Sequence, residues 1–259
     1  MNSDQLELSF EKPDGRHMSV TQLKMYLRCP LQYEFRYVKG LKIPPAGVMT
    51  LGKSIHSTLE ENYRQKIRTG QDLSLEHWRD YFSDTWENSL EETVFEDGEK
   101  PEDLKNDGMK LIDVYHSQIA PNVQPVDVER EFLIDVDGVE VPLLGYIDLI
   151  DDKGFIIDHK VANKSWPKGR EHSDLQLTAY ALAYRQTEGK DENGLRYDVM
   201  VRTKNPKINQ LETTRSQEDI RKFSKLLNHV NRSIKTGIFY PNDNFLCPVC
   251  GYADLCKKW

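Results

Sequence analysis

The chain has 259 residues, of which 38% are hydrophobic and 30% are charged, and its formal net charge is −7. This length suits one large domain or two small ones, and 15 glycines with 12 prolines are too few for a low-complexity or collagen-like chain. The first residues lack the basic start and apolar run of a signal peptide, and no stretch reaches the roughly 18 apolar residues of a membrane span. We therefore expect a soluble, cytoplasmic protein that has no membrane partner.

The negative charge is concentrated in one segment. Residues 87–103 contain eight acidic side chains and one lysine, a run that is typical of a solvated helix end and loop. Two other segments are basic: residues 153–170 contain five basic side chains against Asp158, and residues 196–207 contain four against Asp198. Because the local field rather than the net charge steers a polyanion, the acidity of the whole chain does not exclude nucleic-acid binding.

The first helix is expected after a short tail. Residues 1–18 are polar and are expected to form a flexible tail. Ser19 then opens a Ser-x-x-Gln capping box, which predicts a helix that ends near Pro30. This helix is expected to bury Leu23, Tyr26 and Leu27.

Three more helices are expected before the middle of the chain. Apolar side chains recur every four residues from Leu51 to Ile67, which predicts a long helix with one buried face. Ser74 suits the N-cap of the next helix, and Pro101 suits the first position of a third.

The pattern changes to strands after residue 125. Alternation over 126–136 predicts a strand with Val128, Arg130, Phe132 and Ile134 on one face, and Asp137-Gly138 predicts a hairpin turn. Further strands are expected over 139–150, 154–160 and 195–203, with a helix over 174–187 between the last two. A cap at residues 216–219 predicts a last long helix that ends at Gly237.

These elements predict an α/β fold in which helices flank a mixed central sheet with a crossover helix. We expect one domain over residues 19–259, in which a helical part (19–120) precedes the sheet core (121–215). A helix and a Cys-rich tail (216–259) complete the expected domain.

The four cysteines are unevenly placed. Cys29 is isolated, whereas the other three form a C-x2-C-x5-C cluster at Cys247, Cys250 and Cys256. Disulfide scaffolds are usually short and rich in cysteine, so the pattern favours a four-thiolate site that joins the two ends of the chain. Zinc and an iron–sulfur cluster both accept four thiolates, and unrelated buried thiols are the alternative.

The densest chemical signal is a pair of acids followed by a lysine. Asp148 and Asp158 fall on adjacent expected strands of a hairpin, so their carboxylates can converge, and they would repel each other unless a hard cation lay between them. Lys160 shares a strand face with Asp158 because side chains alternate along a strand. Two acids and a lysine are suited to metal-assisted hydrolysis, whereas turn aspartates with a surface lysine are the ordinary alternative.

Two more groups extend this signal. Gln176 and Tyr180 are four residues apart and therefore lie on one face of the expected helix. His56 lies beside the buried face of the long helix, where a histidine is more often a packed core residue than a ligand. The combined order of these residues is nevertheless difficult to obtain by accident.

Taken together, these motifs resemble the PD-(D/E)XK nuclease superfamily. The G-x-x-D motif ends at Asp148, the D-x-K motif covers residues 158–160, and the Q-x-x-x-Y motif covers residues 176–180. The cysteines and the segment 19–30 are similar to the RecB-like branch with an iron–sulfur cluster, which includes the CRISPR-associated adaptation exonuclease and the nuclease domain of AddB. The resemblance spans residues 19–256 and implies a restriction-endonuclease-like fold.

The resemblance also implies roles for individual residues. Mg²⁺ or Mn²⁺ would be bound by His56, Asp148, Asp158 and the main-chain carbonyl of His159. Lys160 would position or activate the attacking water, while Gln176 and Tyr180 would support the site and contact the DNA backbone. Glu131 is a further candidate carboxylate near the metal. A 4Fe-4S cluster, with zinc as the alternative, would be held by Cys29, Cys247, Cys250 and Cys256.

The segment 163–172 is longer and more basic than a minimal loop. It is either an element that guides the DNA strand or a variable surface loop. Its candidate DNA-binding residues are Lys164, Lys168 and Arg170.

The leading hypothesis is a metal-dependent deoxyribonuclease, an exonuclease on single-stranded DNA or DNA ends. The first alternative is a non-catalytic DNA-binding subunit whose partner is a helicase or a CRISPR adaptation protein. A second alternative is a zinc-stapled structural protein in which the acids are incidental.

Overall fold

The computed structural model describes residues 17–259, so the expected tail lies outside the described residues except for its last two positions. The expected tail boundary at residue 18 is too late, because Met18 already belongs to the folded part of the chain. It is 2% exposed and pairs with Leu143, and its amide donates to the carbonyl of Pro142 at 2.9 Å. In the part of the chain that the structure describes, none of the helices combines the length and the hydropathy that a membrane span requires.

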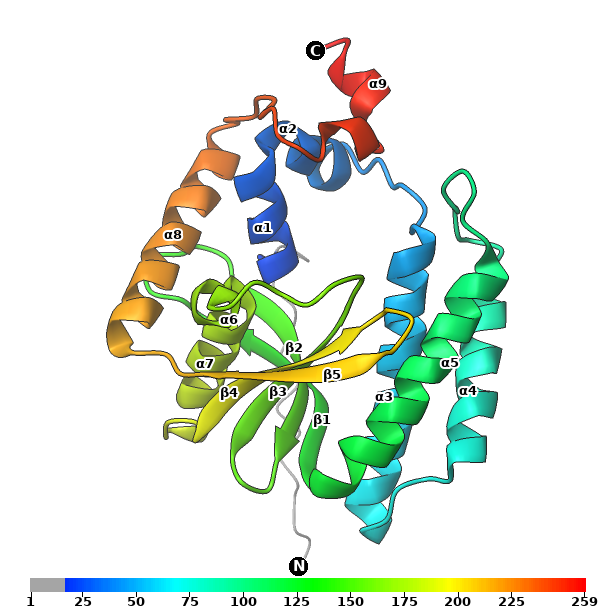
Figure 1. Ribbon diagram of the computed structural model, residues 1–259. Coiled ribbons are helices and arrows are strands. Elements are labelled where there is room, and N and C mark those ends of the chain that lie inside the picture. The colour runs from blue at the N-terminus through cyan, green and yellow to red at the C-terminus, as the bar shows by residue number, and fades with distance from the viewer. Residues whose placement is uncertain (1–16) are drawn as a thin grey trace, which may run out of the picture.

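One group of helices lies to one side of the molecule (Figure 1). It contains α3 (Gly47–Thr69), α4 (Leu75–Asn88) and α5 (Pro101–Gln118), followed by a short 3-10 turn over Ala120–Asn122. Ser74 accepts a hydrogen bond from the amide of His77, and proline occupies the first position of α5, as the sequence predicted.

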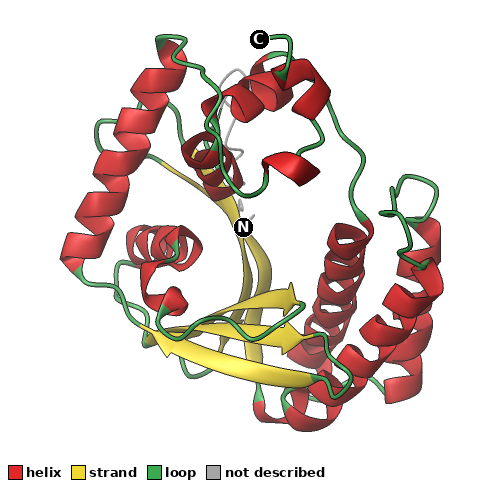
Figure 2. Cartoon of the chain, turned by 45° about the horizontal axis from the view of Figure 1, so that its top comes forward, coloured by secondary structure: helices red, strands yellow, loops and turns green. Residues whose placement is uncertain are grey.

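The remaining helices lie on the other side or at the end that carries the C-terminus (Figures 1 and 2). They are α1 (Val20–Arg28), α2 (Pro30–Tyr33), α6 (Arg170–Ser173), α7 (Leu175–Glu188), α8 (Gln217–Lys235) and α9 (Ala253–Cys256). A π-helical turn over Glu34–Val38 extends α2, and a 3-10 turn over Cys247–Val249 precedes α9. Ser216 and Asp219 form a complete capping box on α8, as the sequence predicted.

The central sheet has five strands in the order β1-β2-β3-β4-β5. They are β1 (Pro125–Ile134), β2 (Leu143–Asp151), β3 (Phe155–Ala162), β4 (Gly194–Val201) and β5 (Lys207–Thr213). Strands β3 and β4 are parallel and are joined through α6 and α7, whereas the other neighbours are antiparallel. The predicted mixed sheet flanked by helices is confirmed. The sequence did not reveal β5 because this edge strand is largely polar.

The sheet separates two hydrophobic cores. Neighbouring residues on a strand point to opposite faces, and Ile156 accordingly joins the core made with α1, α7 and α8, while Ile157 joins the core made with α3, α4 and α5. Val199 and Met200 on β4 divide in the same way. The strands β2 and β3, which carry Asp148 and the D-x-K motif at residues 158–160, are therefore packed against a hydrophobic core on each side.

Two predicted core positions on the helices are wrong. Leu27 is 42% exposed and Ile67 is 43% exposed. A spacing of four residues advances by about 40° more than one full turn of an α-helix. The series that starts at Leu51 therefore turns gradually around α3, and its fifth residue, Ile67, points towards solvent. Lys66 is buried instead, where its ammonium group donates to Asp72 and to the carbonyl of Ala120.

The predicted single apolar face of β1 is also wrong. Val128 packs into the core beside α3, α4 and α5, whereas Phe132 and Ile134 pack into the opposite core. The change of face occurs around Glu129, which has a positive φ of 49°. A left-handed residue interrupts strict alternation because it turns the chain locally.

The C-terminal segment closes back onto the first helices. The amide of Leu31 donates to the carbonyl of Tyr240 at 3.0 Å, and the hydroxyl of Tyr252 donates to the carbonyl of Leu41 at 2.6 Å. This region has a small core of its own, in which Leu31, Phe35 and Tyr252 are buried. Figure 1 shows α9 beside α2, at a distance from the central sheet.

Candidate active site

The candidate site lies where β2 and β3 separate. Their ladder contains only the pairs Leu149 with Ile157 and Ile150 with Ile156. Beyond these pairs, the side chain of Asp148 replaces main-chain pairing, because its Oδ2 accepts a hydrogen bond from the amide of His159 at 2.9 Å. The sequence predicted this convergence of the two strands, and the structure places both motifs at the same point.

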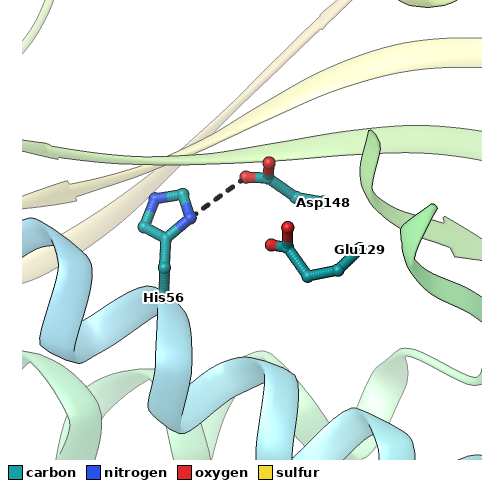
Figure 3. A group of neighbouring side chains, drawn as sticks. All are labelled: His56, Glu129 and Asp148. Carbon is teal, nitrogen blue, oxygen red and sulfur yellow. Dashed lines mark ion pairs between the residues drawn. The ribbon is translucent and has the colours of Figure 1, made fainter. Parts of the chain in front are cut away.

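Three potential metal ligands meet beside α3 (Figure 3). Ligand atoms of His56, Glu129 and Asp148 lie within 4.8 Å of one another, and Figure 3 shows the three side chains directed into one space. The Nδ1 atom of His56 is 3.4 Å from Oδ2 of Asp148. Imidazole nitrogen and carboxylate oxygen are both suitable ligands for a divalent cation.

Glu129 is the member of this group that the sequence did not predict. In the antiparallel register, Val128 faces Leu149 and Arg130 faces Ile147, so Glu129 lies opposite Asp148. The expected residue Glu131 instead accepts a hydrogen bond from the hydroxyl of Tyr146 at 2.6 Å and is exposed. Glu129, rather than the expected Glu131, is therefore the carboxylate that lies beside His56 and Asp148. Only the register could have distinguished the two residues, and the irregular connection after β1 hides it from the sequence.

Buried Asp158 forms an ion pair with the half-buried Lys160 next to these ligands. Asp158 is fully buried, and its Oδ2 contacts the ammonium group of Lys160. Among the described residues, its Oδ1 has no hydrogen-bond partner. A buried carboxylate oxygen without a partner costs free energy, so this atom is a potential ligand.

The local charges shift the pKa values of the acids in opposite directions. Burial would raise the pKa of Asp148, but His56, the hydrogen bond from His159 and the ammonium of Lys160 together lower it below its ordinary value. Burial, reinforced by the charge of Asp148, raises the pKa of Asp158 against the effect of Lys160. Burial and the charges of Asp148 and Glu60 raise the pKa of Glu129 to about 7. The site therefore holds more negative charge than its own cations balance, which favours binding of a cation.

His159 connects the site to a buried polar network that sequence reasoning missed. Its Nε2 atom is 3.0 Å from the hydroxyl oxygen of Tyr115, which also donates to Asp198 at 3.0 Å. Asp198 in turn accepts from Arg196 at 2.8 Å, and Tyr63 donates to Tyr115 at 3.1 Å. The network fixes β3 at the residue whose amide holds Asp148. Nothing in the spacing of these residues along the chain indicates it.

The predicted helix pair of Gln176 and Tyr180 is in place. The side-chain amide of Gln176 donates to the hydroxyl of Tyr180 at 2.8 Å. Tyr180 is 2% exposed, and its pKa is raised by burial and by the charges of Asp148 and Asp158. The pair thus lies close to both acids.

The predicted basic residues lie on the connection between β3 and α7. Lys164, Lys168 and Arg170 are all exposed. The guanidinium of Arg170 lies 4.0 Å from the centre of the Trp166 ring. Within the described part of the chain, no hydrogen bond or ion pair joins these residues to Asp148 or Asp158, and they lie on the segment that follows β3.

The four cysteines surround a separate cavity of about 440 Å³ between α2 and the C-terminal segment. Within the described part of the chain, no disulfide links them. The main-chain amide of Asn244 is directed at the sulfur of Cys247 at 3.3 Å, and the side-chain amide of Gln32 is directed at Cys250 at 3.9 Å. The segment around Cys29 and the C-terminal segment meet here, and all four cysteines line the same cavity.

This geometry defines a class of protein. Convergent carboxylates, a histidine and a half-buried lysine at the junction of two diverging strands can bind a divalent cation and hydrolyse a phosphate ester. The basic connection next to the site suits a polyanionic substrate.

Comparison with known proteins agrees with this class. A model of the PD-(D/E)XK nuclease superfamily matches residues 17–257. Gene 69 protein of Mycobacterium phage D29 is 25% identical over 195 residues, which cover 66% of this chain and 70% of the phage protein. The crystal structure of a candidate exonuclease from Eubacterium rectale is similar with a TM-score of 0.62 at 13% identity, covering 100% of this chain and 94% of the other.

The chain therefore belongs to the PD-(D/E)XK nuclease superfamily. It is a nuclease that hydrolyses phosphodiester bonds, and the family implies DNA as its substrate. The structural likeness to the Eubacterium rectale protein supports the restriction-endonuclease-like fold.

Proposed function

We propose that the protein is a Mg²⁺- or Mn²⁺-dependent exonuclease that acts on single-stranded DNA or on DNA ends. The observation that carries the proposal is the ion pair between buried Asp158 and Lys160 beside Asp148 and His56, at the point where β2 and β3 separate. The name of the Eubacterium rectale protein also supports exonuclease activity.

The residues present fit a divalent cation. The unpartnered Oδ1 of Asp158 and the excess of carboxylates around Asp148 are both suited to a hard metal ion. We assign His56, Asp148, Asp158 and the main-chain carbonyl of His159 as ligands, with Glu129 as an additional one. A bound cation would polarise a phosphoryl oxygen and lower the pKa of a water molecule.

The protein's own groups then account for the remaining steps. Burial would lower the pKa of Lys160, but Asp158 and Asp148 raise it, so the ammonium form is retained. As an ammonium ion, Lys160 can orient the attacking water and offset the negative charge of the transition state. Gln176 and Tyr180 support the site and contact the DNA backbone, and Lys164, Lys168 and Arg170 bind phosphates.

We further propose that the four cysteines hold a 4Fe-4S cluster, as in the RecB-like branch of the superfamily. Four thiolates around zinc would lie about 3.8 Å apart, given a Zn–S bond of about 2.3 Å. Among the described residues, the groups whose ligand atoms lie within 4.8 Å of one another do not include these cysteines. The wider arrangement and the cavity of about 440 Å³ favour a larger cluster. Its role is to join the first helices to the C-terminal segment of a single domain, which we place from Met18 to residue 259 because Met18 is packed against β2.

The alternative function is a non-catalytic DNA-binding subunit that works with a helicase or a CRISPR adaptation protein. The presence of both acids and of Lys160 argues against it, because a non-catalytic site has no need for this combination.

The test is cleavage of end-labelled single-stranded and duplex DNA by the anaerobically purified protein, with Mn²⁺, Mg²⁺ or chelator. We expect metal-dependent degradation, and we expect Asp158→Asn and Lys160→Met to reduce it by roughly 1,000-fold while both variants stay folded. A folded wild-type protein that cleaves neither substrate with either metal would refute the enzymatic proposal and favour the binding subunit.

A further inference from the structure

A groove of about 460 Å³ adjoins the candidate active site. Its walls are the first turn of α3, the end of β3 and the connection that follows β3. The volume falls within the roughly 300–1,000 Å³ of sites that bind small molecules. The groove is separate from the cavity lined by the cysteines.

Both walls of the groove continue the walls of the metal centre. On β3, Ala162 lies on the same face as Asp158 and Lys160, about 6.6 Å beyond Lys160 along the strand. On α3, Met49 precedes His56 by seven residues, or two helical turns, so the two side chains project from nearly the same face. The groove thus begins at the end of β3, where Val161 packs towards α3 and Ala162 towards the opposite core, and it extends the strand that carries Asp158 and Lys160.

Gly52 lies on α3 between Met49 and His56 and leaves the passage between them open. No atom lies within 4 Å of the position that a Cβ would occupy at Gly52, and its φ is outside the left-handed region. Gly108 on α5 is different, because a Cβ there would lie 2.3 Å from the ring of Phe82. Packing therefore explains Gly108, but neither packing nor backbone conformation explains a helix-weakening glycine at position 52.

The lining of the groove matches the chemistry of a nucleotide. Met49, Trp166 and their neighbours give it apolar surface, and its charged members are the cations Lys164, Arg170 and Arg202. Among the described residues that line it, none is acidic, although the chain as a whole is negative. Arg170 lies over Trp166, whose ring meets that of Tyr197 edge to face at 4.9 Å. The ring of Tyr197 is in turn 5.9 Å from Nζ of Lys160.

We propose that the groove binds the nucleotide next to the scissile phosphate of a single DNA strand, and that the bare surface of Gly52 lets the strand backbone pass from the groove to the metal centre. Apolar surface and an arginine–tryptophan pair suit an unpaired base, whose flat faces are accessible for stacking. The bases of an intact duplex are stacked on each other and could not enter. This inference deepens the proposed nuclease function and rests on it.

The experiment compares Gly52→Leu and Trp166→Ala with a control, Thr69→Leu, which adds the same side chain at an exposed position at the far end of α3. Binding of a fluorescent single-stranded oligonucleotide is measured in chelator, and cleavage of single strands and blunt duplexes is measured with Mn²⁺. Thermal melting establishes that each variant is folded, and Gly52→Leu is expected to melt no lower than wild type because leucine is the better helix former.

We expect Gly52→Leu to reduce cleavage of single strands by about 100-fold, because it displaces the strand from the reacting groups. Trp166→Ala should weaken binding by about tenfold through lost stacking, and Thr69→Leu should match wild type. A folded Gly52→Leu protein that cleaves and binds like wild type would overturn the inference, as would a wild-type preference for blunt duplexes. If wild type binds but never cleaves, the nuclease proposal fails, whereas the binding measurements still decide whether the groove is used.

Discussion

The candidate metal centre around Asp148 and Asp158 and the cysteine site are held by the fold in different ways. At the metal centre, Asp158 is fully buried and His159 is 2% exposed, and both lie on a central strand between two hydrophobic cores. At the cysteine site, Cys247 is exposed, Val249 is 69% exposed and Phe245 is 87% exposed. The first site is shaped by packing on both sides and by the hydrogen bonds of Asp148 and His159, whereas the second rests on a small core in which Leu31, Phe35 and Tyr252 are buried, so the proposed cluster would add much of its stability.

This difference explains why the two inorganic groups have different roles in the proposal. A cation at the metal centre enters an arrangement that the sheet and α3 already provide, so it contributes chemistry. A cluster at the cysteines would supply the binding energy that keeps residues 241–259 against α2, so it contributes structure.

The largest expected effect is the loss of that structure when one cysteine is changed. Cys256→Ser should lose the proposed cluster, and with it the free energy that metal binding contributes to folding. We expect the segment after α8 to become sensitive to proteases while the sheet remains resistant. Iron content and limited proteolysis measure the two effects, and Asp158→Asn is the control that should retain both iron and resistance. A Cys256→Ser protein with full iron content and a resistant C-terminal segment would contradict the comparison.

The next effect concerns Glu129 as a metal ligand. Glu129→Gln should raise the Mn²⁺ concentration required for half-maximal cleavage by about 10- to 100-fold, while activity at saturating metal changes much less. Glu131→Gln is the matched control, because Glu131 is two residues away and only accepts a hydrogen bond from Tyr146. Equal metal requirements in the two variants would exclude Glu129 from the site.

The same residue predicts how pH affects the metal-free protein. Burial and two neighbouring carboxylates raise the pKa of Glu129 from 4.5 to about 7. Because folding raises the pKa of Glu129, its protonated form contributes fully to the stability of the folded protein below pH 4.5. This contribution is lost as the pH rises through about 7 and the carboxyl group ionises. In chelator, Glu129→Gln should therefore melt higher than wild type above pH 7, and the difference should shrink as the pH approaches 4.5. A difference that is constant over this range would show that the ionisation of Glu129 is not its cause.

The smallest expected effect is on the polar network behind the metal centre. Tyr115→Phe leaves His159 and Asp198 each without one hydrogen-bond partner, which should lower the free energy of unfolding by about 1–3 kcal/mol. Tyr63→Phe removes a single donor to Tyr115 and should cost about 1 kcal/mol. Chemical denaturation measures the free energy of unfolding of both variants. A larger loss for Tyr63→Phe than for Tyr115→Phe would contradict the central position of Tyr115 in the network.

The sequence by itself determined the chemical groups and the fold class. The motifs around Asp148, Asp158 and Lys160 are close in the chain and lie on a hairpin, so local spacing was sufficient to bring them together. Capping residues such as Ser74 and Ser216 marked helix starts for the same reason, since a cap acts over three or four residues. The roles of the individual site residues nevertheless stay predictions until they are tested.

Only the tertiary structure decided what depends on register and on approach between distant elements. The irregular connection between β1 and β2 sets Glu129 rather than Glu131 opposite Asp148, and a shift of two residues along a strand leaves the alternation of side chains unchanged. Tyr115 reaches His159 from a helix 44 positions earlier in the chain. The open space over Gly52 likewise depends on how the other elements pack around α3, and no local pattern encodes the distance between two packed elements.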